Sequence, residues 1–119
     1  MIQIESVKGL ENLNEILKVD GIDGVFIGAV DLSATMGYQG NPNHPEVQKA
    51  VIDAIQRIRA AGKAAGILST QHDITQKYLD LGAEFVAVGV DTSVLMNSLR
   101  ERLSKYKQGT EVVKSEGGY

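Results

Sequence analysis

Cysteine and tryptophan are both absent from the 119-residue sequence. Without cysteine the chain forms no disulfide, no thiolate nucleophile and no zinc–sulfur site, which fits a reducing compartment. Basic residues are also scarce, since 12 Lys and Arg face 15 Asp and Glu and the net charge is −3. No basic cluster is present that could neutralise several phosphates, so we expect no nucleic-acid partner.

Long apolar runs are missing as well. No stretch reaches the roughly 18 apolar residues that a membrane-spanning helix needs. The first residues, MIQIES, have neither the basic start nor the apolar core of a signal peptide. We therefore expect no membrane partner and a cytoplasmic location. The length suffices for one domain with a buried core and not for two.

Glycine, by contrast, is abundant, with 13 residues against two prolines, and many glycines fall where apolar runs end. Four short apolar runs each precede a stretch in which apolar residues recur at helical spacing: residues 1–4, 24–27, 64–68 and 85–90. This alternation predicts four consecutive strand–helix units around a parallel sheet.

The helices are predicted from their caps and their apolar spacing. One amphipathic helix is expected after Ser6, its cap, with apolar residues from Leu10 to Leu17. The longest is predicted to begin at Pro45 and to stop at Gly62. A shorter helix over residues 73–81 and a last one over residues 94–106 complete the set.

Four strand–helix units are half of a closed barrel, which takes eight strands and about 250 residues. We therefore predict half of a TIM barrel over residues 1–107, followed by a polar tail over residues 108–119. The edges of such a sheet invite pairing, so we expect a homo-oligomer or a separate chain that supplies the missing half. A small doubly wound sheet is the alternative architecture.

Acidic residues follow the first two predicted strands. Glu5 comes directly after the first, and Asp31 lies three residues beyond Gly28, where the second ends. Functional residues of parallel α/β proteins gather at the carboxyl ends of strands, and strands about 4.8 Å apart would bring the two carboxylates together. Two such oxygen donors suit Mg²⁺ or Mn²⁺. The alternative is that both residues only cap helices, where acidic side chains are common.

Only His44 and His72 are able to titrate near neutral pH. His44 precedes Pro45 and is predicted to position the helix that follows rather than to act as a base. His72 falls near a helix start on the carboxyl side of the sheet, where we expect a solvated loop histidine.

Five segments between residues 1 and 107 keep a distinctive order and spacing: IQIE at 2–5, GVFIG at 24–28 with DLS at 31–33, HPEV at 44–47, AAGK at 60–63, and FVAVGVDT at 85–92. Together they resemble the C-terminal half of the HpcH/HpaI aldolase family. Members of this family are metal-dependent pyruvate aldolases, including 4-hydroxy-2-oxoheptanedioate and 2-keto-3-deoxy sugar-acid aldolases.

The resemblance implies a TIM-barrel fold and a role for particular residues. Glu5 and Asp31 would hold the divalent metal, and the backbone N–H groups of Val30 and Asp31 would bind the pyruvate carboxylate. Leu68 and Val90 would line an apolar pocket wall, although ordinary core packing explains them equally well. The turn differs from the family's Gly-Pro-Ala-Asp run, because Ala29 replaces the proline and removes its fixed dihedral.

The implied activity is the cleavage of 4-hydroxy-2-oxo acids to pyruvate and an aldehyde, with Mg²⁺ or Mn²⁺ as Lewis acid. The family's catalytic arginine and histidine–aspartate base belong to the N-terminal half and have no counterpart here. All four arginines are predicted on helices: Arg57, Arg59, Arg100 and Arg102. The resemblance thus implies a truncated aldolase that keeps the metal and pyruvate site. The alternative is a non-catalytic half-barrel module that pairs with an N-terminal half or with itself.

Overall fold

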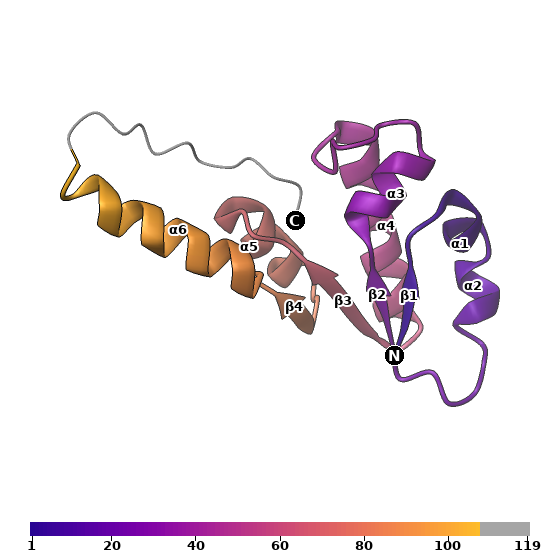
Figure 1. Ribbon diagram of the computed structural model, residues 1–119. Coiled ribbons are helices and arrows are strands. Elements are labelled where there is room, and N and C mark those ends of the chain that lie inside the picture. The colour runs from indigo at the N-terminus through magenta and orange to yellow at the C-terminus, as the bar shows by residue number, and fades with distance from the viewer. Residues whose placement is uncertain (108–119) are drawn as a thin grey trace.

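The computed structural model describes residues 1–107 (Figure 1). One parallel sheet has its strands in the order β1-β2-β3-β4: β1 (Ile2–Ile4), β2 (Gly24–Ile27), β3 (Ala64–Leu68) and β4 (Phe85–Ala87). A doubly wound sheet would reverse its strand order at a switch point, and here each strand pairs with the next in the chain. The prediction of four parallel strand–helix units forming half a TIM barrel is therefore confirmed. The predicted tail over residues 108–119 lies outside the described residues.

Helices follow every strand: α1 (Val7–Glu11), α2 (Leu13–Ile16), α3 (Ala29–Thr35), α4 (Pro45–Ala60), α5 (His72–Asp80) and α6 (Asp91–Ser104). The prediction of one helix from the Ser6 cap to near Gly21 is wrong, because the helix is interrupted at Asn12, between α1 and α2. The Asn12 side-chain amide donates to the Lys8 carbonyl at 2.9 Å, a local bond that competes with a regular helix. Among residues 1–107, none of the helices combines the length and the hydropathy of a transmembrane segment.

The fourth strand is shorter than the predicted run of residues 85–90, and α6 begins three residues before its predicted start. Strand β3 ends at Leu68, whose partner is Ala87, and Ser69 N donates to the Ala87 carbonyl at 2.9 Å. Val88 to Val90 therefore extend past the end of the neighbouring strand, and strand pairing stops.

The core lies on one face of the sheet, between the strands and helix α4, which packs against β2 and β3. Alternate strand residues point into it: Ile4, Val25, Ile27, Ala65 and Ile67. Helix α4 packs its apolar side chains against them: Val47, Val51, Ala54, Ile55 and Ile58. Burial of these side chains is the main source of the fold's stability.

The opposite face, which would be the inside of a closed barrel, carries one row of residues in register: Gln3, Phe26, Gly66 and Phe85. The Phe26 and Phe85 rings meet edge to face over Gly66, with centroids 6.1 Å apart. Phe85 is nevertheless 55% exposed, so this row is only partly covered. We call this surface the inner face.

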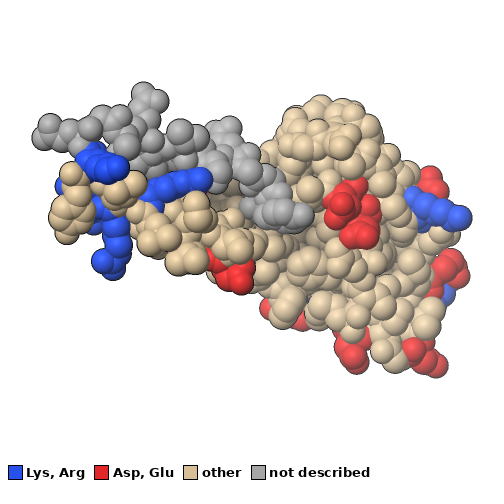
Figure 2. Space-filling view, viewed as in Figure 1, with Lys and Arg blue, Asp and Glu red and all other residues tan. Residues whose placement is uncertain are grey.

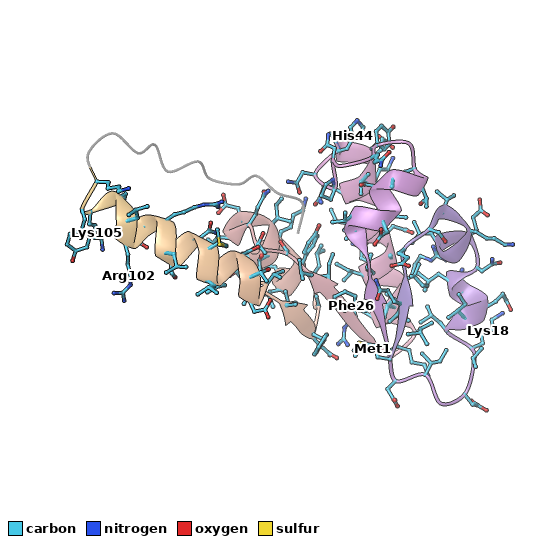
Figure 3. All side chains as sticks on the ribbon, viewed as in Figure 1. Met1, Lys18, Phe26, His44, Arg102 and Lys105 are labelled. Atoms are coloured by element: carbon cyan, nitrogen blue, oxygen red, sulfur yellow. The ribbon has the colours of Figure 1, made fainter. Side chains whose placement is uncertain are left out.

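Helix α6 extends away from the sheet (Figure 1) and has no buried residue. The large apolar side chains of this helix and of Tyr106, just after it, are exposed and are called here the α6 stripe: Val94, Leu95, Met96, Leu99, Leu103 and Tyr106. In Figure 2, Lys and Arg side chains gather over the end of this helix, and Figure 3 labels Arg102 and Lys105 there.

Candidate metal and carboxylate site

Glu5 lies directly over Gly28 at the carboxyl edge of the sheet. Ile4 pairs with Ile27, and Gly28 N donates to the Ile4 carbonyl at 2.9 Å, so the pairing continues one residue past both strands. A Cβ added to Gly28 would lie 2.9 Å from Glu5 Cβ and 3.1 Å from Glu5 Oε2. The absence of a side chain at Gly28 leaves the space that the glutamate occupies.

Asp31 belongs to the helix that starts at the same glycine. Gly28 is the N-cap of α3, and Asp31 lies in the first turn of that helix. The side chains of Glu5 and Asp31 are both exposed, and within residues 1–107 neither carboxylate is paired with a basic side chain. The fold thus brings the Glu5 carboxylate to the N-terminal end of the helix that carries Asp31.

The capping alternative does not account for Glu5. Helix α1 is capped by Ser6, whose Oγ accepts a hydrogen bond from Gly9 N at 3.1 Å, as predicted from the sequence. The first turn of α1 contains no acidic residue. Asp31 does lie where a carboxylate favours the helix dipole, so for this residue both roles are compatible with the structure.

Gln3 makes a polar contact with Glu5 that was not predicted from the sequence. Its Nε2 donates to Glu5 Oε2 at 2.6 Å. The signal was available, because side chains two positions apart in a strand share a face. An amide two residues before a strand-end glutamate is therefore a candidate partner for that glutamate.

The predicted carboxylate-binding groups lie in the first turn of α3. The N–H groups of a first helical turn have no acceptor within the helix, and those of Val30 and Asp31 are among them. Ser33 Oγ donates to the Val30 carbonyl at 2.6 Å.

The two predicted wall residues are placed differently. Ile27 pairs with Ile67, so Leu68, the last residue of β3, continues the row of Glu5 and Gly28. Val90 is the N-cap of α6 and lies three residues past the end of β4. Both are half-buried, and only Leu68 shares the row of the glutamate.

Neither histidine joins the carboxylates. His44 caps α4 by accepting a hydrogen bond from Glu46 N at Nδ1, 3.2 Å away, and its ring stacks on Tyr38 at 3.7 Å. The predicted positioning role is confirmed. Figure 3 labels His44 at the top of the view and Met1 below it. His72 is the exposed first residue of α5.

The arginines lie on helices, as predicted. Arg57 and Arg59 belong to α4, and Arg100 and Arg102 belong to α6. Arg57 donates to the Leu10 carbonyl at 3.2 Å and thereby ties α4 to α1. None of the four follows a strand, so no guanidinium of this chain adjoins the carboxylates by its place in the fold.

Glu5 and Asp31 fit the ligand set of a magnesium-type ion. Residues 1–107 contain no group of three or more His, Asp or Glu that could enclose a metal by itself. Mg²⁺, however, is usually held by only one or two carboxylates, with water and substrate oxygens completing the shell. The Glu5 carboxylate, which lies against Gly28, and the Asp31 carboxylate, carried by the first turn of α3, are donors of the type that such an ion requires.

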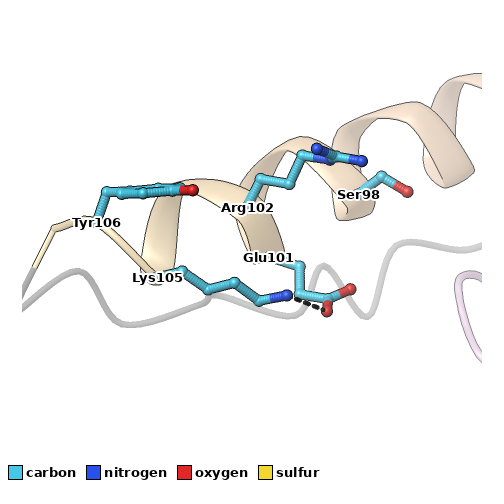
Figure 4. A pocket seen from close by; sticks show the side chains of 5 residues that line it. All are labelled: Ser98, Glu101, Arg102, Lys105 and Tyr106. Atoms are coloured by element: carbon cyan, nitrogen blue, oxygen red, sulfur yellow. Dashed lines mark ion pairs between the residues drawn. The ribbon is translucent and has the colours of Figure 1, made fainter.

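A hollow on α6 is a separate feature (Figure 4). Its lining comes from one helix and the residues just after it: Ser98, Glu101, Arg102, Lys105 and Tyr106. Lys105 Nζ lies 3.5 Å from Glu101 Oε1. This hollow lies along the second half of α6 and not at the carboxyl edge of the sheet.

A parallel strand–helix repeat with acidic residues at its carboxyl edge is characteristic of (βα)₈-barrel enzymes, here represented by half a barrel. The profile of the HpcH/HpaI aldolase/citrate lyase family matches residues 1–98, and the chain belongs to this family. The resemblance seen in the sequence motifs is therefore confirmed.

Three similar proteins illustrate the relationship. A hydroxypyruvate/pyruvate aldolase of Pseudomonas aeruginosa is 61% identical over 109 residues, which are 92% of this chain and 41% of the relative. A 2-keto-3-deoxy-L-rhamnonate aldolase of Escherichia coli (strain K12 / DH10B) is 52% identical over 119 residues, 100% of this chain and 45% of the relative. The crystal structure of an HpcH/HpaI aldolase/citrate lyase family protein from Burkholderia cenocepacia J2315 superposes with a TM-score of 0.82 at 30% identity, covering 87% of this chain and 41% of that one. The chain thus spans less than half the length of these relatives.

Proposed function

We propose that this chain is the metal- and pyruvate-binding half of a divalent-metal-dependent aldolase that cleaves 4-hydroxy-2-oxo acids to pyruvate and an aldehyde. The observation that carries the proposal is the position of Glu5 over Gly28, the residue that starts the helix of Asp31. The names of the two relatives, one a hydroxypyruvate/pyruvate aldolase and the other a 2-keto-3-deoxy-L-rhamnonate aldolase, support this class of substrate.

Each site residue has a distinct role in this proposal. Glu5 and Asp31 would hold Mg²⁺ or Mn²⁺, which supplies Lewis-acid stabilisation of the pyruvate enolate when bound. The Val30 and Asp31 N–H groups donate to the pyruvate carboxylate from the first turn of α3. Leu68 and Val90 cover the apolar side of the substrate and exclude water there.

Residues 1–107 offer no positioned general base in this scheme. His44 is used as a helix cap, and His72 is exposed at the start of α5. Proton transfer would therefore depend on groups outside residues 1–107, and we expect binding without efficient turnover. A cytoplasmic location remains the expectation from composition.

Ligand binding and catalysis provide separate tests. With Mn²⁺ present, pyruvate or oxalate is expected to raise the melting temperature of the chain, and Asp31→Ala is expected to abolish the increase. Cleavage of 4-hydroxy-2-oxo acids is expected to be slow or absent. A melting temperature that responds to neither metal nor pyruvate would refute the site. Rapid cleavage that Asp31→Ala abolishes would refute the expectation that no general base is positioned at the site.

A non-catalytic assembly module is the second candidate function. The inner face around Phe85 is partly exposed, and within residues 1–107 the outer edges of β1 and β4 have no neighbouring strand. Both features favour a partner that completes the barrel, a separate N-terminal half. The α6 stripe favours contact with a second copy of the chain. Light scattering distinguishes these cases, since a heat-stable monomer at low concentration would contradict self-pairing.

A further inference from the structure

We infer that Gln3 is a positioning residue of the metal site: its amide holds one oxygen of the Glu5 carboxylate and leaves the other for a divalent cation. The inference rests on the proposed function and adds to it a residue outside the predicted ligand pair. Its basis is the contact between these two side chains and the space that Gly28 leaves for them.

Strand β1 sends its side chains to opposite faces. Ile4 is buried against the helices, while Gln3 and Glu5 share the inner face. Gln3 Nε2 donates a short hydrogen bond to Glu5 Oε2, 2.6 Å away, whose acceptor is a charged carboxylate. Within residues 1–107 this is the only hydrogen bond or ion pair found for the Glu5 carboxylate, so Oε1 has no protein partner there.

Gly28 makes the contact sterically possible. A Cβ at this position would lie 2.9 Å from both Gln3 Nε2 and Glu5 Cβ, closer than real side chains approach. The amide and the carboxylate therefore meet in the space above the residue that begins the helix of Asp31. A cation between the two carboxylates would find Glu5 already oriented.

The Gln3 hydrogen bond contributes little to folding, because both of its partners are exposed. Its effect is to restrict rotation of the carboxylate before the metal arrives. Hydrogen bonds that orient metal ligands in this way typically change metal affinity by about 10- to 100-fold when they are removed.

The test is a titration of the 119-residue chain with Mn²⁺, followed by the electron paramagnetic resonance signal of the unbound ion. Gln3→Met keeps the size of the side chain and removes the donor. It is expected to weaken Mn²⁺ binding by about 10- to 100-fold at an unchanged melting temperature of the metal-free chain. Gln3→Asn, whose amide is one carbon shorter, is a second variant expected to weaken binding.

Gln76→Met is the matched control. Gln76 Nε2 donates to Asp80 Oδ1 at 2.8 Å on the exposed surface of α5, so this variant removes the same kind of bond away from the site. It is expected to bind Mn²⁺ like the wild type. The visible absorption of bound Co²⁺, which reports ligand geometry, is expected to change in Gln3→Met and not in Gln76→Met.

The outcomes distinguish the role of Gln3 from the proposed function of the site. Glu5→Gln is expected to abolish Mn²⁺ binding. If the wild type binds Mn²⁺ and Gln3→Met binds it equally well, the role of Gln3 is overturned and the proposed function stands. If the wild type binds no better than Glu5→Gln, the proposed function and the role of Gln3 are both overturned.

Discussion

Replacing Gly28 by alanine tests whether the space above this residue matters for the site. Gly28 has a φ of −84°, which alanine also adopts, so the backbone itself does not require glycine. The obstacle is steric, because the new Cβ would lie 2.9 Å from Gln3 Nε2 and from Glu5 Cβ. The Gln3 amide is able to swing away, but Glu5 Cβ is fixed to strand β1, so the end of that strand must shift.

The size of the effect follows from two opposing contributions. Overpacking of this kind costs about 1–3 kcal/mol. Alanine recovers about 0.4–1 kcal/mol by restricting the unfolded chain. We therefore expect Gly28→Ala to lower the free energy of unfolding by up to about 2.5 kcal/mol, measured by urea denaturation. Mn²⁺ affinity is expected to fall by about 10- to 100-fold, because the displaced groups are a ligand and the amide that orients it.

Gly66→Ala is the control for this experiment. Its Cβ would lie 2.9 Å from Phe26 Cδ2 and 3.2 Å from the Phe85 carbonyl oxygen, so it strains the same sheet two strands away from Glu5. It is expected to destabilise the fold without changing Mn²⁺ affinity. Folded Gly28→Ala protein with wild-type Mn²⁺ affinity would refute the reasoning.

Three further predictions concern the cap of α4, a buried tyrosine and the α6 stripe. His44→Ala is expected to cost about 1 kcal/mol in urea unfolding through loss of the cap, whereas His44→Asn, which is also able to cap, retains most of it; equal losses would contradict a capping role. Burial raises the pKa of Tyr78 above its usual value of 10.0, partly opposed by its hydrogen bond with Gln48. The neutral ring is thus favoured in the folded state, so wild-type stability is expected to fall as pH rises above about 10. Tyr78→Phe should lose less stability than the wild type as the pH rises over that range. At neutral pH the variant should be about 1 kcal/mol less stable than the wild type, because it lacks the 3.0 Å hydrogen bond to Gln48. Parallel curves of stability against pH for the two proteins would contradict the first expectation. If a second copy covers the α6 stripe, Leu99→Glu is expected to lower the mass measured by light scattering, and an unchanged oligomer would contradict that contact.

The fold was largely predictable because its signals are local. Strand β3 has the predicted bounds, and α4 begins at Pro45 as predicted, since proline favours the first helical position. The end of β4 was not predictable from its own residues, because Val88 and Val90 continue the apolar pattern of a strand. What ends the strand is the end of its neighbour at Leu68, a tertiary effect that leaves no mark on residues 85–90.

The site was predictable in part for the same reason. Strand ends identified Glu5 and Asp31, and the register of β1 with β2 brings Glu5 to the start of the helix of Asp31. Their metal-binding role stays a prediction. The contact of Gln3 with Glu5 depends on side-chain rotamers and on the space above Gly28, and neither follows from spacing alone.

The two faces of the sheet have different roles: one is buried in the core and stabilises the fold, and the other carries the residues of the proposed site. Ile4 and Ile27 point into the core, and losing such a side chain costs about 2–5 kcal/mol. Gln3 and Glu5 alternate with Ile4 on the same strand and point to the inner face, where they are exposed. A strand that is packed against the core on one face tolerates polar and charged side chains on its solvent-exposed face. The carboxyl edge can therefore carry unpaired acidic side chains without loss of the fold, a condition that a binding site for a divalent cation requires and a purely structural sheet edge does not.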